Sequence, residues 1–136
     1  SGEIVWNMAT FDLRWQMSES SAPLARGESE FAHTGLTMAP SRLVQAPRVK
    51  ESPAQLECKV TDIFQLRDME GGMTPRFLVM GQVIGIHIED EFIENGIVQI
   101  TRMKPIARCG YQDYSVLDEV FAIKRPAGAG NNEAGG

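Results

Sequence analysis

The sequence predicts a single, mainly β domain folded as a small barrel, and three observations support this fold class. Residues 54–60 alternate apolar and polar side chains, which is the pattern of a strand with one buried face. Residues 77–88 form the longest apolar stretch, and both alternating sets of side chains are apolar, so both faces of that strand should be covered. The pair Asn95-Gly96 lies between two short apolar segments, which is a strong hairpin signal.

The composition is that of an ordinary soluble globular protein. The 136 residues are 43% hydrophobic and 23% charged, which suits one domain with one core. Acidic residues outnumber basic ones by 18 to 13, and the net charge of −5 argues against a nucleic-acid partner, which requires a basic surface. No apolar run approaches the roughly 20 residues of a membrane span. No secretory signal is present, so we expect a cytoplasmic protein with no membrane partner.

The first part of the chain should contain a strand, a short helix and an ordered loop. Residues 3–7 match a short apolar strand, and Thr10 can cap a helix over residues 10–18. Apolar residues alternate in that second segment, so a strand is the competing interpretation, but we favour the helix. Residues 18–30 are polar and predict an ordered loop, because apolar residues anchor it.

The middle of the chain should be extended. A short strand is expected at residues 35–38, and three prolines between residues 40 and 53 exclude a long helix there. The apolar face swaps after residue 60, which predicts a bulge or bend near residues 61–62. Gly81 and Gly85 share a face of the following strand, which marks a bend or the close approach of another backbone or a flat ligand.

The last part of the chain should hold one more strand and a tail. A turn is expected at residues 68–75, a short strand at residues 105–109 and an apolar patch at residues 117–123. Residues 127–136 are rich in Gly and Ala and predict a disordered tail, so the folded domain should comprise residues 1–126.

Sequence motifs for several enzyme classes are absent. The chain contains no GxSxG, GxxxxGK or HExxH pattern. Cys58 and Cys109 are neither in a CxxC motif nor beside a histidine, so no metal site is expected and both should be buried free thiols, although a disulfide between them stays open.

Three short segments carry candidate binding residues. The segment 108–114 places an arginine beside a glycine and two aromatic residues, which suits the wall of a site for a flat, electron-rich ligand but also suits an ordinary loop. His87 could bind a metal or a cofactor ring, or it could be a hydrogen-bonded histidine at a strand end. The hydroxyls of Ser18, Ser20 and Ser21 could contact an anion or a ring edge, or simply belong to a helix end and its loop.

Several motifs, in this order and spacing, resemble the long form of the flavin reductase-like family of FMN-binding split barrels. The resemblance runs from about Gly2 to Pro126, and no single motif carries it alone. The matching segments are Asn7–Thr10, Met17–Pro23, Glu30-Phe31, Gly35–Thr37, Ser41–Val44, Pro47–Val49, Glu51–Cys58, Gly81–Ile88, Pro105–Gly110 and Asp113-Tyr114.

The resemblance implies a Greek-key split barrel that pairs as a homodimer with FMN between the subunits. Members of the family reduce FMN with NAD(P)H, or hold FMN as an electron carrier or oxidoreductase cofactor, and the flavin ring performs the hydride chemistry. Ser20 and Ser21 stand where relatives carry a Thr-Ser pair near the flavin. His87, Arg108 and Tyr111 are further candidates for flavin contact.

The chain also departs from the family pattern. Strands that precede the segment matching Gly2 in the family have no counterpart here, so residues 1–126 are expected to be the C-terminal portion of the domain, with exposed strand edges. Tyr111 stands where the family often has a second glycine after Gly110. Three interpretations therefore stay open: an FMN-dependent oxidoreductase, an FMN-binding module without turnover, and a piece completed by another chain.

Overall fold

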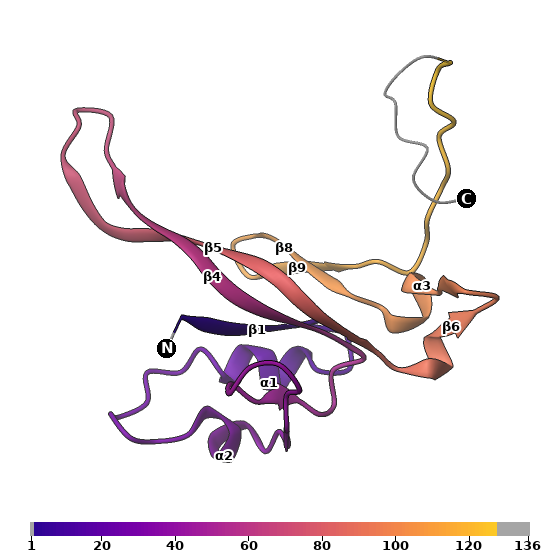
Figure 1. Ribbon diagram of the computed structural model, residues 1–136, viewed down its shortest axis with the longest axis horizontal. Coiled ribbons are helices and arrows are strands. Elements are labelled where there is room, and N and C mark those ends of the chain that lie inside the picture. Colours follow the sequence, from indigo (N-terminus) through magenta and orange to yellow (C-terminus); the bar gives the residue numbers. More distant parts are fainter. Residues whose placement is uncertain (1, 128–136) are drawn as a thin grey trace.

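The computed structural model describes residues 2–127 and is mainly β with short helices, as the sequence predicts (Figure 1). The predicted tail at 127–136 lies outside the described residues except for Ala127. The elements in chain order are β1 (Glu3–Asn7), α1 (Arg14–Glu19), α2 (Glu30–Thr34), β2 (Met38–Ala39), β3 (Arg48–Val49), β4 (Ala54–Arg67), β5 (Met73–Ile88), the 3₁₀ helix η1 (Asp90–Phe92), β6 (Ile93–Glu94), β7 (Ile97–Val98), α3 (Ile100–Met103), β8 (Ile106–Gly110) and β9 (Asp113–Val116).

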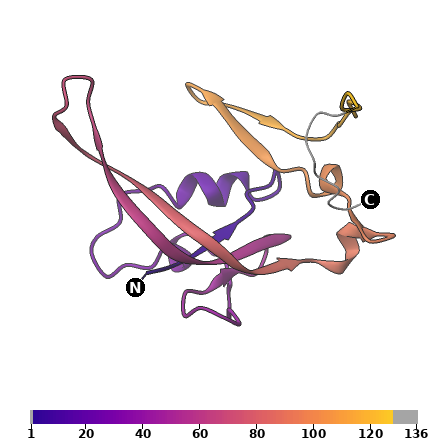
Figure 2. The ribbon, with the colours of Figure 1, turned by 45° about the horizontal axis from the view of Figure 1, so that its top comes forward.

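The largest sheet has three antiparallel strands in the order β1-β4-β5. Strands β4 and β5 form a long hairpin whose far half extends beyond the body of the molecule (Figures 1 and 2). The register between them shifts at Val60/Asp62, which confirms the predicted bulge near residues 61–62. We call the far half of this hairpin, residues 62–80, the β4–β5 arm.

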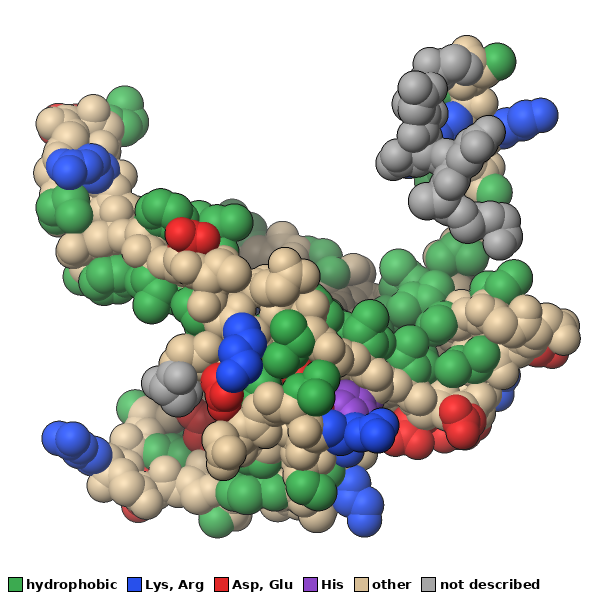
Figure 3. Space-filling model, in the orientation of Figure 1, with side chains coloured by type: hydrophobic (Ala, Val, Ile, Leu, Met, Phe, Trp, Pro, Cys, Tyr) green, Lys and Arg blue, Asp and Glu red, His purple; other side chains and the backbone are tan. Residues whose placement is uncertain are grey.

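The prediction of two covered faces for residues 77–88 is wrong over most of that range, since Val83, Ile84 and Ile86 beyond the arm are exposed as well. Phe77, Leu78, Val79 and Met80 are all exposed, because the described chain places no second layer against this ribbon. Hydrophobic side chains accordingly gather along the arm in the space-filling view (Figure 3).

The helix predicted at residues 10–18 exists but begins at Arg14. Thr10 forms an antiparallel bridge with Pro105, and the Phe11 amide donates to the Lys104 carbonyl at 2.9 Å, so these residues are tied to a distant segment. The loop predicted at 18–30 is followed by α2, which the sequence reading did not anticipate. Gly35, at φ 73°, ends α2 in the left-handed conformation.

The Asn95-Gly96 hairpin is confirmed: β6 and β7 pair across it, and both turn residues have positive φ. Strands β8 and β9 form a further hairpin, with Ile106 opposite Val116. Cys58 and Cys109 are both free thiols; Cys58 is buried as expected, but Cys109 is exposed on the β8–β9 hairpin, so the expectation of a buried thiol is wrong there.

The prediction of one buried face for residues 54–60 is also incomplete. Gln55 and Glu57, on the face expected to be polar, are as buried as Ala54 and Cys58 on the other. Strand β1 pairs along one edge of β4, while the segment 41–49 lies over the polar face and hydrogen-bonds to it. The best-packed part of the molecule is therefore the base of the β4–β5 hairpin.

Candidate functional site

A groove of about 660 Å³ lies between helix α1 and the β8–β9 hairpin. We call it the α1–hairpin groove. One wall consists of α1 and the turn before it, and the other consists of the two paired strands. Its lining residues are Phe11, Arg14, Trp15, Met17, Ser18, Ile106, Arg108, Gln112, Asp113, Tyr114 and Val116.

The α1 wall presents an arginine stacked on two aromatic rings. The Arg14 guanidinium lies 4.0 Å from the centre of the Phe11 ring and 5.3 Å from that of Trp15. It also donates to the Phe11 carbonyl at 2.6 Å, which fixes its plane. Trp15 keeps 68% of its surface exposed, so its ring is available to a ligand.

The hairpin wall repeats this arrangement with Arg108. Its guanidinium lies 5.5 Å from the centre of the Tyr114 ring and donates to the Tyr114 hydroxyl at 3.1 Å. A second donation, to the Tyr111 carbonyl at 2.5 Å, ties the guanidinium to the turn. Gly110 (φ 106°) and Tyr111 (φ 49°) both have positive φ there, and the register shifts between Arg108 and Gly110. Arg108 therefore holds the turn as well as facing the groove.

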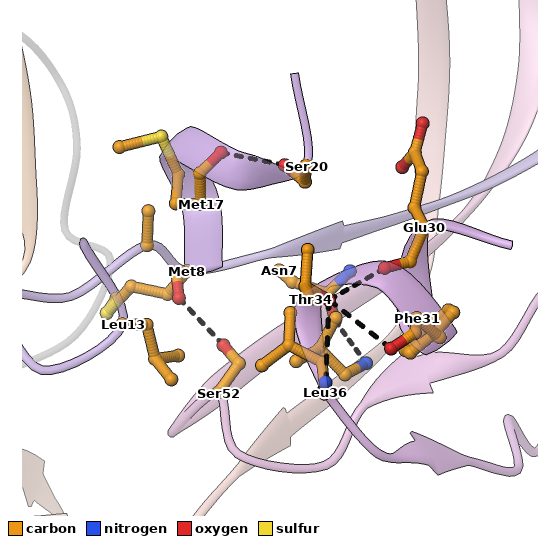
Figure 4. A pocket seen from close by; sticks show the side chains of 12 residues that line it. Asn7, Met8, Leu13, Met17, Ser20, Glu30, Phe31, Thr34, Leu36 and Ser52 are labelled. Carbon is orange, nitrogen blue, oxygen red and sulfur yellow. Dashed lines mark hydrogen bonds between the residues drawn. The ribbon is translucent and has the colours of Figure 1, made fainter. Parts of the chain in front are cut away.

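A smaller pocket of about 260 Å³ lies among β1, α1, α2 and β3, and Met17 lines both it and the groove. Its polar groups are largely paired within the chain, as Figure 4 shows. The Ser20 hydroxyl donates to the Met17 carbonyl at 2.8 Å, the Thr34 hydroxyl to the Glu30 carbonyl at 2.7 Å, and the Ser52 hydroxyl to the Met8 carbonyl at 2.9 Å. The pocket therefore offers mainly apolar surface to a ligand.

The most extensively hydrogen-bonded carboxylate belongs to Glu57, which has no solvent exposure. Three consecutive backbone amides, of Arg42, Leu43 and Val44, donate to it at 2.8, 2.6 and 3.2 Å. Nε2 of His87 lies 2.5 Å from the same carboxylate. Gly85 faces Glu57 across the strands and leaves room for the Leu43 side chain, since a Cβ there would lie 3.2 Å from Cδ1 of Leu43.

These contacts set the charge of Glu57. Burial acts to raise its pKa, but the hydrogen bonds from the Arg42 amide, His87 and the Leu43 amide outweigh burial and lower the pKa from 4.5 to about 2. The neighbouring amide of Gln45 donates to Glu3 at 2.7 Å, and this bond, followed by the bond from Lys59, lowers the pKa of Glu3. Two carboxylates thus fasten the segment 42–45 to the sheet.

The structure separates the five residues that the sequence suggested as flavin contacts. Arg108 and Tyr111 are joined by a hydrogen bond at the β8–β9 turn. Ser20 and Ser21 lie at the C-terminal end of α1, where the Ser21 hydroxyl donates to the Ser18 carbonyl at 2.7 Å. His87 is apart from both pairs, in a hollow of about 170 Å³ beside Glu57.

Sequence reasoning missed three residues that matter here. Arg14 and Trp15 belonged to a segment with two competing secondary structures, so their shared face was not evident. Glu57 belongs to the polar set of alternating residues in its strand, which predicts exposure. Nothing near it in the sequence indicated that the segment 41–45 would cover it. The motif Ser41–Val44 was the one available signal, because it was part of the resemblance.

Two further classes of site are not seen in the described part of the chain. Residues 2–127 contain no group of three or more His, Cys, Asp or Glu side chains placed to hold a metal ion. None of the helices between these residues has the length and apolar character needed to cross a membrane.

Comparison with known proteins decides the family. The model of the flavin reductase like domain matches residues 1–105 of this chain. The chain belongs to the flavin reductase-like domain family. The match covers β1 through α3, so it includes the α1 wall of the groove and the Glu57 cluster.

Individual relatives agree with this family. An uncharacterised protein of Halalkalibacterium halodurans is 32% identical over 97% of this chain, which spans 63% of that protein. The crystal structure of nitrilotriacetate monooxygenase component B from Bacillus cereus superposes with a TM-score of 0.81, at 28% identity, over 90% of this chain and 60% of that one. A Shewanella frigidimarina protein described as having a split barrel domain gives a TM-score of 0.79, at 24% identity, over 93% of this chain and 62% of that one.

The structural neighbours of this mainly β chain are thus flavin reductase-like split barrels. Its family is a flavin-binding one. The chain spans about three fifths of the length of each of these relatives.

Proposed function

We propose that this flavin reductase-like chain binds FMN through the α1–hairpin groove and serves an NAD(P)H-dependent oxidoreductase. The observation that carries the proposal is the pair of similar walls, each with a guanidinium within 5.5 Å of the centre of an aromatic ring. Flat ligands that carry negative charge are held by this combination of stacking surface and fixed cations.

The residues present fit the chemistry of FMN. Trp15 and Tyr114 offer ring faces for the flavin, and Arg14 and Arg108 offer positive charge for its phosphate or its pyrimidine carbonyls. Both guanidiniums keep N–H groups beyond those bonded within the chain, since arginine carries five donors. When bound, FMN supplies the hydride acceptor and donor of the reaction.

Ser20 and Ser21 would take part as hydrogen-bonding groups at the end of α1, next to the residues that line the groove; Ser20 itself lines the smaller pocket. Their hydroxyls donate to helix carbonyls in this structure, so each retains its oxygen as an acceptor for a ligand N–H or O–H. If either hydroxyl rotated, it could donate to the ligand instead, and its bond to the helix carbonyl would be lost. We assign His87 to the Glu57 cluster and not to the groove, because its ring is held by that carboxylate.

We also propose that the functional unit is a homodimer that covers the β4–β5 arm. The arm exposes apolar side chains on both strands, and a contiguous apolar surface of this kind is typical of an interface. A second copy of the chain would remove that surface from water. The exposed apolar residues of the arm are Ile63, Phe64, Leu66, Met69, Met73, Phe77, Leu78, Val79 and Met80.

The test combines FMN binding with turnover. FMN is titrated against the protein while quenching of flavin fluorescence is followed, and NADH or NADPH is then added anaerobically while the flavin absorbance is recorded. The proposal expects saturable micromolar binding, at least about tenfold weaker binding by Arg108→Ala, and bleaching by one of the two donors. Arg26→Ala, at an exposed loop arginine, is the matched control and should bind like the parent.

The two outcomes that contradict the proposal are distinct. Binding without bleaching would identify an FMN-holding module without turnover. A folded protein that fails to bind FMN would show that the groove alone is not the flavin site.

A further inference from the structure

Tyr111 is the least covered aromatic residue at the groove, with 95% of its surface exposed. It is at the tip of the β8–β9 hairpin, and the three residues that follow it, Gln112, Asp113 and Tyr114, all line the groove. Tyr111 therefore lies beside the groove, and its ring is open to solvent and to a ligand.

The backbone conformation of Tyr111 is costly for a tyrosine. Its φ of 49° lies in the left-handed region, which favours glycine, and its own ring makes little contact that could offset that cost. A side chain kept in a strained position without a packing partner is a candidate for contact with something outside the chain.

Arg108 holds this tip in place. Its donations to the Tyr111 carbonyl and to the Tyr114 hydroxyl join the turn to the groove wall. The same guanidinium thus joins the hairpin wall of the groove to the backbone of Tyr111. The backbone of Tyr111 is therefore held beside the groove, while its ring is exposed.

We propose that Tyr111 is a specificity-determining contact that stacks on a planar aromatic second substrate at the mouth of the groove. The proposal rests on the proposed flavin function, because the second substrate is the partner in electron exchange. An aromatic ring is the class of ligand that gains most from a freely rotating tyrosine, since ring stacking requires a flat face.

Tyr111 favours this occupant over a saturated one of the same charge. In the FMN-loaded protein the flavin would cover the Trp15 and Tyr114 rings, so the exposed Tyr111 ring is the aromatic surface left for a second planar ring. The charged groups at the groove are Arg14, Arg108 and Asp113, and these act equally on an aromatic and a saturated acid. Aromaticity alone therefore separates the two ligands.

The experiment uses the FMN-loaded protein and two probes matched in charge and size, benzoate and cyclohexanecarboxylate. Binding is followed through the perturbation of the flavin absorption spectrum. The parent should bind benzoate at least about fivefold more tightly than cyclohexanecarboxylate. Tyr111→Phe should keep that preference, and Tyr111→Ala should lose it through weaker benzoate binding.

Control measurements separate a ligand contact from other roles. FMN affinity should stay within about twofold of the parent in both variants, because Tyr111 does not line the groove. Met69→Ala removes a side chain that is 98% exposed at the tip of the other long hairpin and should leave the benzoate preference unchanged. Tyr111→Gly should raise thermal stability relative to Tyr111→Ala, since only glycine relieves the backbone strain.

The proposal is overturned if the parent binds both acids equally or binds neither. It is also overturned if Tyr111→Ala keeps the benzoate preference, or if that variant changes the oligomeric state in sedimentation, which would make Tyr111 an interface residue. The two acids are also titrated against the flavin-free protein, with binding followed by tryptophan fluorescence. If the parent failed to bind FMN, the proposed function would be contradicted, and the comparison of Tyr111 variants could still be made in the flavin-free protein.

Discussion

His87 places Nε2 2.5 Å from the Glu57 carboxylate, diagonally across strands β4 and β5. The carboxylate is fully buried and also accepts three consecutive backbone amides from the segment 42–44. A single acidic side chain thus joins two strands and the loop that covers them. Removing this side chain should therefore destabilise the whole base of the β4–β5 hairpin.

Glu57→Gln should destabilise the fold by about 3 kcal/mol at pH 7, because a neutral amide cannot accept all of the bonds that the carboxylate accepts. The pKa of Glu57 is lowered from 4.5 to about 2, so its ionised form stabilises the folded state above pH 4.5. That contribution is lost as the pH falls from about 4.5 toward 2. Urea unfolding of both proteins between pH 7 and pH 2 measures the difference.

The two proteins should therefore converge in stability at the acid end of this range. A constant difference from pH 7 to pH 2 would show that Glu57 stabilises the fold by shape and packing rather than by its charge.

Gly85→Ala should destabilise the protein by about 1–2 kcal/mol, since its new Cβ would lie 3.2 Å from Leu43 Cδ1 and 3.5 Å from Glu57 Cβ. Gly81 on the same strand is the matched control, because a Cβ there would have ordinary contacts of 3.4 Å. Thermal unfolding should show a clearly larger loss for the Gly85 variant. Equal losses would mean that Leu43 moves aside without cost.

Arg108→Lys should weaken FMN binding about tenfold while keeping the positive charge. Lysine is a flexible point charge and cannot bond the Tyr111 carbonyl and the Tyr114 hydroxyl from one rigid plane, as Arg108 does. Isothermal titration with FMN measures the change. Binding equal to the parent would show that charge alone, and not the held turn, is what the flavin site requires.

Leu78→Lys should dissociate the proposed homodimer, because it introduces a charge into the apolar surface of the arm. Phe121→Lys alters an apolar residue that is 86% exposed outside the arm and serves as the control. Sedimentation velocity should give a monomer for the first variant and the parental mass for the second. A dimer that survives Leu78→Lys would place the interface elsewhere.

The sequence predicts those elements whose signals are local. The Asn95-Gly96 turn follows from residues that tolerate positive φ, and the bulge near residues 61–62 follows from a change in apolar parity. The family also follows from the order of short motifs, which the domain match over residues 1–105 confirms.

Features that depend on distant contacts were not predictable in this way. The sequence pattern places Glu57 on the polar side of a strand. Its burial depends on a loop 13 to 15 residues away, whose amides donate to the carboxylate. The start of α1 is delayed because Thr10 and Phe11 bond to the segment 104–105. The two guanidinium–aromatic walls of the groove come from segments about ninety residues apart, and only the fold brings them to the same groove.

The most direct test of the flavin site uses the two tryptophans of the chain as internal reporters. Trp15 lines the groove, whereas Trp6 is on β1 and lines neither the groove nor the smaller pocket. FMN is added to ¹⁵N-labelled protein while the two indole N–H signals are followed, with Trp15→Phe to assign them. We expect the Trp15 signal to shift saturably with FMN and the Trp6 signal to stay in place. A shift of Trp6 alone, or saturable FMN binding that leaves Trp15 unchanged, would contradict the placement of the flavin in the α1–hairpin groove.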